Sequence, residues 1–107
     1  MAELIEVHTT VEGQEKAADL AHDILRAGLA ASIDLSPVTR LVRWETGVEE
    51  TGAWKVAALT VDTRLPALRQ RIERAHGDAV VPPILTFPVT TGSEAYLEWL
   101  HNEIDLS

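Results

Sequence analysis

The sequence contains no cysteine, so the chain forms no disulfide and holds no metal ion through thiolates. Basic residues are few: 9 Lys or Arg stand against 17 Asp or Glu, and the formal charge of −8 disfavours nucleic acids and anionic membranes as partners. No apolar run approaches the roughly 20 residues of a spanning helix, and no basic signal segment opens the chain. We therefore predict a cytoplasmic protein whose partners are cations, neutral small molecules or copies of itself.

What is present is ordinary for a globular fold. Hydrophobic residues make up 46% of the 107 residues and charged residues 24%, which argues against disorder. A chain of this length builds one hydrophobic core, so residues 1–107 are predicted to form a single domain.

Residues 29–45 organise the rest of the prediction. Apolar and polar residues alternate from Ser32 to Leu35, the pattern breaks at Pro37, and it resumes toward Trp44. Alternation with a period of two predicts a half-buried strand, and a proline inside it belongs at a bulge, a bend or an edge. One long, bent strand of this length exceeds what the sheet of a small domain covers. We expect the overhang to pair with another copy of the chain.

The remaining elements follow from hydrophobic spacing. Residues 4–9, 53–62 and 84–89 are predicted strands, and residues 45–52 a polar hairpin tip. The first helix, residues 13–27, ends at Gly28. Caps are expected at Thr63 for the second helix and Ser93 for the last, whose apolar face is Tyr96, Leu97, Leu100 and Ile104. The order β-α-β-β-α-β plus a C-terminal helix predicts an α+β, ferredoxin-like sandwich with two helices on one sheet face.

Polar side chains are expected to gather on the other face of the sheet. If Ile5 and Val7 pack under the helices, alternation places Glu6 and His8 on the open face. The open-face set is completed by Ser32, Asp34, Thr60, Asp62 and Thr86, with Leu59 and Val61 assigned to the core. A His/Asp/Asp set of this kind suits a divalent cation such as zinc or manganese, or proton transfer without a metal.

Other candidates have equally simple explanations. His76 with Asp78 is either a metal-ligating pair or a solvated helix end. Arg40 and Arg43 either hold an anionic ligand or pair with the glutamates of the hairpin. The aromatic residues Trp44 and Trp54 are predicted to anchor a subunit interface. The sequence contains no Ser-His-Asp order, phosphate-binding glycine loop or HExxH motif.

Several segments in order resemble the CutA family of divalent-cation tolerance proteins. They are the Leu-Ala-Ala run at residues 29–31, Arg43-Trp44, Val81-Pro82 and the run from Tyr96 to Leu100. The resemblance covers nearly the whole chain. It implies a tight homotrimer built by pairing the long strands of neighbouring subunits, and a role with copper, zinc or another divalent metal ion.

The chain departs from this family where the family's polar signature lies. Ser32 and Asp34 replace a cysteine and an asparagine, and a lysine is absent before Asp62. The loop from His76 to Pro83 lacks a tyrosine and two glutamates, and His8 stands where the family tends to be apolar. These changes suggest that the scaffold has been adapted to another ligand or reaction.

Three functions follow. The first is a homotrimer that binds a small ligand or divalent metal ion in clefts between subunits. The second is an enzyme on the same scaffold, with His8 as acid or base, Asp62 or Asp34 orienting it, and Arg43 or Lys55 holding substrate charge. The third is an effector-binding regulator resembling the trimeric PII proteins. The candidate ligand-binding residues are Arg43, Trp44, Lys55, Thr60 and Thr86, and the candidate metal ligands are His8, Asp34, Asp62, His76 and Asp78.

Overall fold

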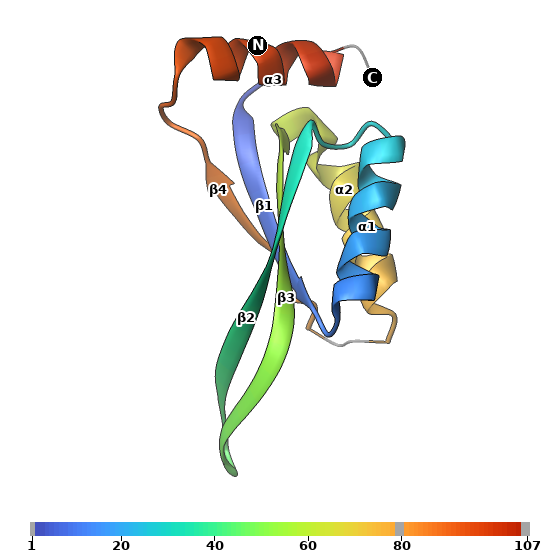
Figure 1. Cartoon of the computed structure of the whole chain (residues 1–107), viewed down its shortest axis with the longest axis vertical. Helices are drawn as coiled ribbons and strands as arrows, with labels where there is room; N and C mark the ends of the chain where they lie inside the picture. Colours follow the sequence, from blue (N-terminus) through green and yellow to red (C-terminus); the bar gives the residue numbers. More distant parts are fainter. Residues whose placement is uncertain (1, 79–80, 106–107) are drawn as a thin grey trace.

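An antiparallel four-stranded sheet carries the fold, in a computed structural model that describes residues 2–78 and 81–105 (Figure 1). The elements in order are β1 (Leu4–Val11), α1 (Gln14–Arg26), β2 (Ser32–Trp44), β3 (Gly47–Val61), a 3₁₀ turn (Asp62–Arg64), α2 (Leu65–His76), β4 (Leu85–Pro88) and α3 (Glu94–Asp105). The strands lie in the order β2-β3-β1-β4. The predicted α+β sandwich with an added C-terminal helix is confirmed.

Helices α1 and α2 cover one face of the sheet, the helix face (Figure 1). The predicted inward residues Ile5 and Val7 are buried there, 6% and 1% exposed, against Ile24 of α1 and Leu68 of α2. Helix α1 ends as expected at Gly28, whose φ of 70° lies in the left-handed region. The Gly28 N–H donates to the Leu25 carbonyl and the Leu29 N–H to the Ile24 carbonyl, which satisfies the last turn in a Schellman arrangement.

Helix α3 covers part of the opposite face, across the end of the sheet where β1 begins (Figure 1). Leu100 and Ile104 pack there against Leu4 and Val61, and all four are at most 8% exposed. The expected Ser93 cap is present, because the Tyr96 N–H donates to Ser93 Oγ at 3.3 Å. The assignment of Tyr96 to the buried stripe is wrong: its side chain is 46% exposed and stacks on Trp99 instead.

The β2–β3 ribbon projects far beyond the helices and makes the molecule 47 Å long but only 26 and 21 Å in its other dimensions (Figure 1). The long second strand is confirmed at 13 residues. Pro37 lies on edge strand β2, opposite Trp54, and the register passes through it without a bulge. The turn is only Glu45–Thr46, so the predicted tip at residues 45–52 is too long and β3 begins six positions earlier than expected. No hydrophobic core covers the first residues of β3 on the outer ribbon. Burial therefore does not require apolar and polar residues to alternate there, and the sequence gives no strand signal.

The start of α2 also differs from expectation. Thr63 lies inside the 3₁₀ turn, and the residue before the helix is Arg64, which makes no capping side-chain bond. Pro66 occupies the first turn as expected, where its missing N–H costs no helical bond. Among the described residues, no helix is long and apolar enough to cross a membrane.

Candidate functional site

The strand register decides which side chains share the face opposite α1 and α2, called here the His8 face. Residues paired across an antiparallel ladder point to the same side of the sheet. One row across the His8 face is Asp34, Ala57, His8 and Leu85, and the next is Ser36, Lys55 and Thr10. The predicted placement of His8 and Asp34 on one face is therefore confirmed, two strand spacings or about 10 Å apart.

Thr60 and Thr86 are not on this face, and their predicted placement beside His8 is wrong. Thr60 is paired with Ile5 and Thr86 with Val7, so both point to the helix face. Thr60 is fully buried, and its hydroxyl donates to the Leu29 carbonyl at 2.7 Å. Leu59 and Val61 lie on the His8 face, where α3 rather than α1 and α2 buries them. Because helices cover both faces at this end of β3, hydrophobicity alone assigned the wrong face.

Asp62 lies away from His8, so the predicted His8–Asp62 pair does not form. Its carboxylate accepts a bond from the Glu3 N–H at 3.2 Å, and its own N–H donates to the Glu3 carbonyl. Asp62 is five positions along β3 from Ala57, the residue opposite His8, or roughly 17 Å at the rise of a strand. The carboxylate closes the end of the β1–β3 ladder.

His8 instead contacts residues on its own and the adjoining strand. Its Nε2 lies in contact with Glu6 Oε1, two positions along β1. The imidazole also packs at a tilted angle against the Phe87 ring, with centroids 4.8 Å apart. The His8 side chain is only 18% exposed.

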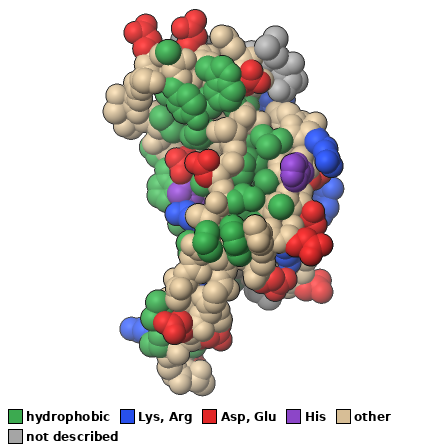
Figure 2. Space-filling view, in the orientation of Figure 1, with side chains coloured by type: hydrophobic (Ala, Val, Ile, Leu, Met, Phe, Trp, Pro, Cys, Tyr) green, Lys and Arg blue, Asp and Glu red, His purple; other side chains and the backbone are tan. Residues whose placement is uncertain are grey.

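A hollow of about 370 Å³, called here the His8 cleft, opens beside this group. Apolar side chains line one part of it, and the basic side chains of Arg40 and Lys55 another. Its lining is His8, Thr9, Thr10, Val38, Thr39, Arg40, Lys55, Pro83, Leu85 and Phe87. Figure 2 shows where the narrow ribbon leaves the body of the molecule, and the Arg40 side of the cleft lies on that ribbon. No acidic side chain is part of this lining.

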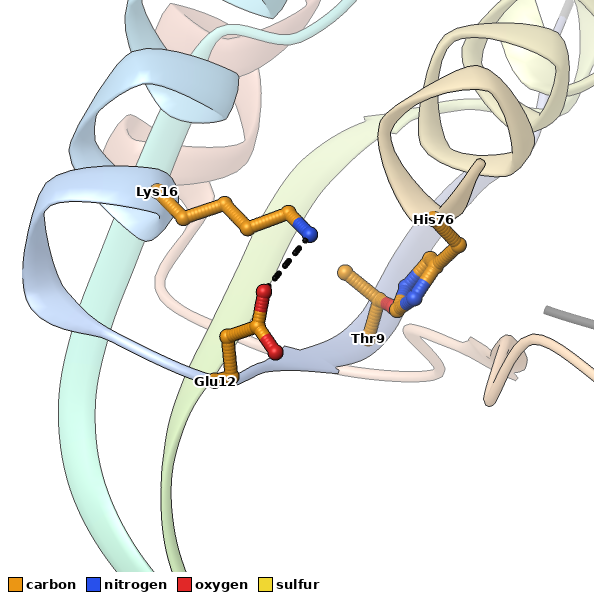
Figure 3. A network of polar contacts seen from close by, with 4 residues as sticks. All are labelled: Thr9, Glu12, Lys16 and His76. Carbon is orange, nitrogen blue, oxygen red and sulfur yellow. Dashed lines mark hydrogen bonds and ion pairs between the residues drawn. The ribbon is translucent and has the colours of Figure 1, made fainter. Parts of the chain in front are cut away.

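A second hollow of about 490 Å³ adjoins the first and shares Thr10, Arg40 and Pro83 with it. Figure 3 shows the polar network beside it. The Thr9 hydroxyl and His76 Nε2 form a hydrogen bond of 2.8 Å, and Lys16 Nζ lies 3.1 Å from Glu12 Oε1. Burial and the positive charge of Lys16 lower the pKa of His76, against a smaller opposing effect of Glu12. The bond to Thr9 ties the end of α2 to β1, and the lowered pKa of His76 favours the neutral imidazole.

The other predicted site residues lie apart from these hollows. Arg43 and Trp44 are at the ribbon tip, where Trp44 is 56% exposed. Asp78 is exposed in the turn after α2, and Asp34 is exposed on β2. Across residues 2–78 and 81–105, no group of three or more His, Asp or Glu side chains is close enough to hold a metal ion.

Sequence reasoning missed the apolar wall of the His8 cleft. Phe87 and Leu85 alternate with polar Thr86 in β4, and this pattern assigns them equally well to a core. Pro83 gave no signal beyond an extended backbone. Thr9 and Lys16 were not singled out as site residues because their contacts with His76 and Glu12 depend on how α1 and α2 dock.

The sequence and the fold were compared with known proteins. The family model described as "CutA1 divalent ion tolerance protein" matches residues 5–103. The chain belongs to this family. The divalent-cation tolerance protein CutA of Thermus thermophilus is 30% identical over 92 residues, which are 85% of this chain and 88% of that protein. The structure of CutA from Synechococcus elongatus has a TM-score of 0.87 at 28% identity, covering 97% of this chain and 92% of that one.

Plant members of the CutA family are longer. The chloroplastic CutA of Arabidopsis thaliana is 31% identical over 92% of this chain, but the match covers only 54% of that protein. The chain spans about half the length of the plant relatives it matches. Because these relatives are named chloroplastic, a cytoplasmic location stays a prediction.

Proposed function

We propose that this CutA-family protein is a homotrimer that binds a small ligand in the His8 cleft. Both outer strands of the sheet, β2 and β4, have one unpaired edge in a single chain. The ribbon also exposes large apolar side chains: Leu41 is 65%, Trp44 56% and Val48 69% exposed. Unpaired edges and exposed apolar side chains are the features that association between copies would cover.

The cleft itself is the observation that carries the ligand proposal. It combines apolar walls at Leu85 and Phe87 with basic groups at Arg40 and Lys55, the mixture typical of small-molecule sites. The cleft is open in one chain and lies between the ribbon and β4, the two parts that offer edges to a neighbour. A second structure of CutA from S. elongatus is of a complex with a Bis-Tris molecule, which supports small-molecule binding by this fold.

Binding of a divalent metal ion is the second candidate, supported by the contact between His8 and Glu6. An imidazole and a carboxylate are two suitable ligands for zinc or copper. A further ligand would come from another copy, because the described residues of one chain supply no set of three. Of the predicted metal ligands, Asp62 and His76 already bond within the chain, to the Glu3 N–H and to Thr9.

The enzymatic and regulatory alternatives receive less support. The enzyme alternative assigned the orienting acid to Asp62 or Asp34. Asp62 lies roughly 17 Å along the sheet from His8 and Asp34 about 10 Å across it. The acid that contacts His8 is Glu6 instead. An effector-binding role like that of PII proteins would use the same cleft, with Arg40 and Lys55 as the basic groups.

Light scattering and calorimetry test the proposal together. Light scattering on the full chain is expected to give the mass of three chains. Zinc and copper titrations are then run on the wild type, on His8→Ala, and on His22→Ala as a control, because His22 is exposed on α1. Metal heat that is lost only in His8→Ala supports the metal candidate. Equal heats in both variants reject it, and a monomeric mass rejects the shared cleft.

A further inference from the structure

We infer that the ligand of the His8 cleft is an organic anion: a carboxylate or phosphate group joined to a flat apolar body. This inference rests on the proposed function and adds the chemical class of the ligand. It follows from how charge and apolar surface are distributed within the cleft.

The charge of the cleft is opposite to that of the protein. The chain carries 17 acidic and 9 basic residues, yet the cleft lining holds Arg40 and Lys55 and no acid. A local positive site in a negative protein attracts anions only at close range, because the general field repels them. Such a site therefore selects for an anion that can also make short-range contacts.

Lys55 is the stronger of the two anchors. It lies in mid-strand between Ser36 and Thr10 and is half-buried, whereas Arg40 is exposed on the ribbon. Neither side chain forms a salt bridge with any described residue. An anion beside a half-buried cation is attracted through a lower effective dielectric than one beside an exposed cation, so the attraction is stronger.

The acidic residues on the same face do not form an ion pair with Lys55, so Lys55 is available to bind an anion. Glu6 contacts His8, so its carboxylate is engaged outside the cleft lining. Asp34 lies two residue pairs along the ladder from the Ser36–Lys55 pair, but it is exposed and makes no ion pair with Lys55. The hydroxyl group of Thr10, which is paired with Lys55 and shares its face, completes the basic side as a hydrogen-bond donor for anionic oxygens.

The apolar part of the ligand is indicated by the opposite wall. Leu85 and Phe87 are 62% and 45% exposed, and Pro83 lies next to them in the lining. The Phe87 ring packs at a tilted angle on the imidazole of His8, which limits its freedom to turn away. A flat ring laid on this wall would bury apolar surface and stack on Phe87 while its acidic group reaches Lys55.

Calorimetric titration of the full chain with five probes tests the class. Phenyl phosphate and benzoate carry both features, inorganic phosphate lacks the ring, benzamide lacks the charge, and benzylamine has the opposite charge. We expect benzamide and benzylamine to bind at least tenfold more weakly than benzoate, and inorganic phosphate more weakly than phenyl phosphate. Added sodium chloride should weaken the two anionic ring compounds, because exposed ion pairs are screened.

Two pairs of variants locate the charge. Lys55→Met should raise the Kd for benzoate about tenfold to hundredfold, the usual worth of a hydrogen bond to a charged group. Lys16→Met, the control, removes a lysine that pairs with Glu12 outside the cleft lining. Arg40→Gln should weaken binding, and Arg43→Gln, on the same strand but outside both hollows, should not. The Arg40 pair keeps the test valid if Lys55→Met does not fold.

The outcomes separate the inference from the proposed function. If benzamide or benzylamine binds as tightly as benzoate, or inorganic phosphate as tightly as phenyl phosphate, the ligand class is wrong while the cleft remains a binding site. If Lys16→Met or Arg43→Gln weakens anion binding as much as the cleft variants do, the inferred ligand class is also wrong. If no probe and no metal ion binds the assembled protein, both the class and the proposed function fail.

Discussion

Replacing Thr60 by valine is expected to lower the stability of the fold and leave binding intact. Thr60 is fully buried on the helix face of β3, opposite Ile5, and its hydroxyl donates a 2.7 Å hydrogen bond to the Leu29 carbonyl. That carbonyl follows directly on Gly28, where the chain leaves α1. The bond therefore links the end of α1 to the centre of the sheet.

The size of the effect follows from what valine removes. Valine has nearly the shape of threonine, so the cavity contribution is small and the lost bond dominates. A buried carbonyl left without its donor costs about 1–3 kcal/mol of the free energy of unfolding. The slope of unfolding free energy against urea is about 1–3 kcal/mol per molar for a chain of this size, so the midpoint should fall by roughly 1 M.

Urea unfolding followed by tryptophan fluorescence measures this at one fixed protomer concentration, because assembly contributes to apparent stability. The matched control is Thr86→Val, which changes an exposed threonine on the same sheet face. We expect the control to stay within about 0.5 kcal/mol of the wild type. A Thr60→Val protein of unchanged stability that no longer binds benzoate would refute this reasoning and return Thr60 to the ligand site.

The remaining predictions concern packing, backbone conformation and protonation. Leu100→Ala should lower the free energy of unfolding by about 2–5 kcal/mol, because this 1% exposed side chain holds α3 on the sheet. Gly28→Ala should cost about 1 kcal/mol because φ is 70° there, whereas Gly13→Ala should cost less, since nothing lies within 4 Å of the added carbon. Below pH 6.5 the wild type should lose stability relative to His76→Gln, because the lowered pKa of His76 makes the unfolded chain bind more protons. Urea midpoints measured at several pH values check all three.

Each of these has a contradicting result. Stability of Leu100→Ala within 1 kcal/mol of the wild type would mean that α3 is not docked as described. Equal costs for the two glycine variants would mean that the φ of Gly28 is not what the helix end requires. Parallel pH profiles of wild type and His76→Gln would mean that His76 is as easily protonated in the folded protein as in the unfolded one.

Local signals predicted most of the elements. The extent of α1, the glycine after it and the serine before α3 are each set by a few neighbouring residues, and the structure confirms all three. The length of β2 was predicted because its alternation resumes after Pro37 and continues toward Trp44. The extent of β3 was not, because its first residues lie on the ribbon, where no core imposes a pattern on the sequence.

The faces of β3 depended on information that is not local. At this end of β3 both faces of the sheet are buried, since α3 packs on one face and α1 and α2 on the other. Leu59 and Val61 lie on the first face and Thr60 on the second. Only the pairing of Ile5 with Thr60 settles which side is which. The same pairing separates Asp62 from His8. The sequence had placed the two faces of β3 the wrong way round, so Thr60 and Asp62 were wrongly grouped with His8.

The sequence predicted those site residues that are polar or charged within a strand. His8 was noticed because it is a titratable residue in the middle of a predicted strand, and Lys55 because its charge could anchor a substrate. The apolar wall formed by Leu85 and Phe87 gave no such signal. An apolar residue in a strand is typical of a core, and only its exposure in the structure, 62% for Leu85, marks it as available to a ligand.

Light scattering on the purified full chain at micromolar concentration tests the central claim most directly. The account predicts the mass of three chains, with the ribbon edges paired between copies and the His8 cleft enclosed. A stable mass of one chain, unchanged on dilution and on addition of benzoate, would contradict it.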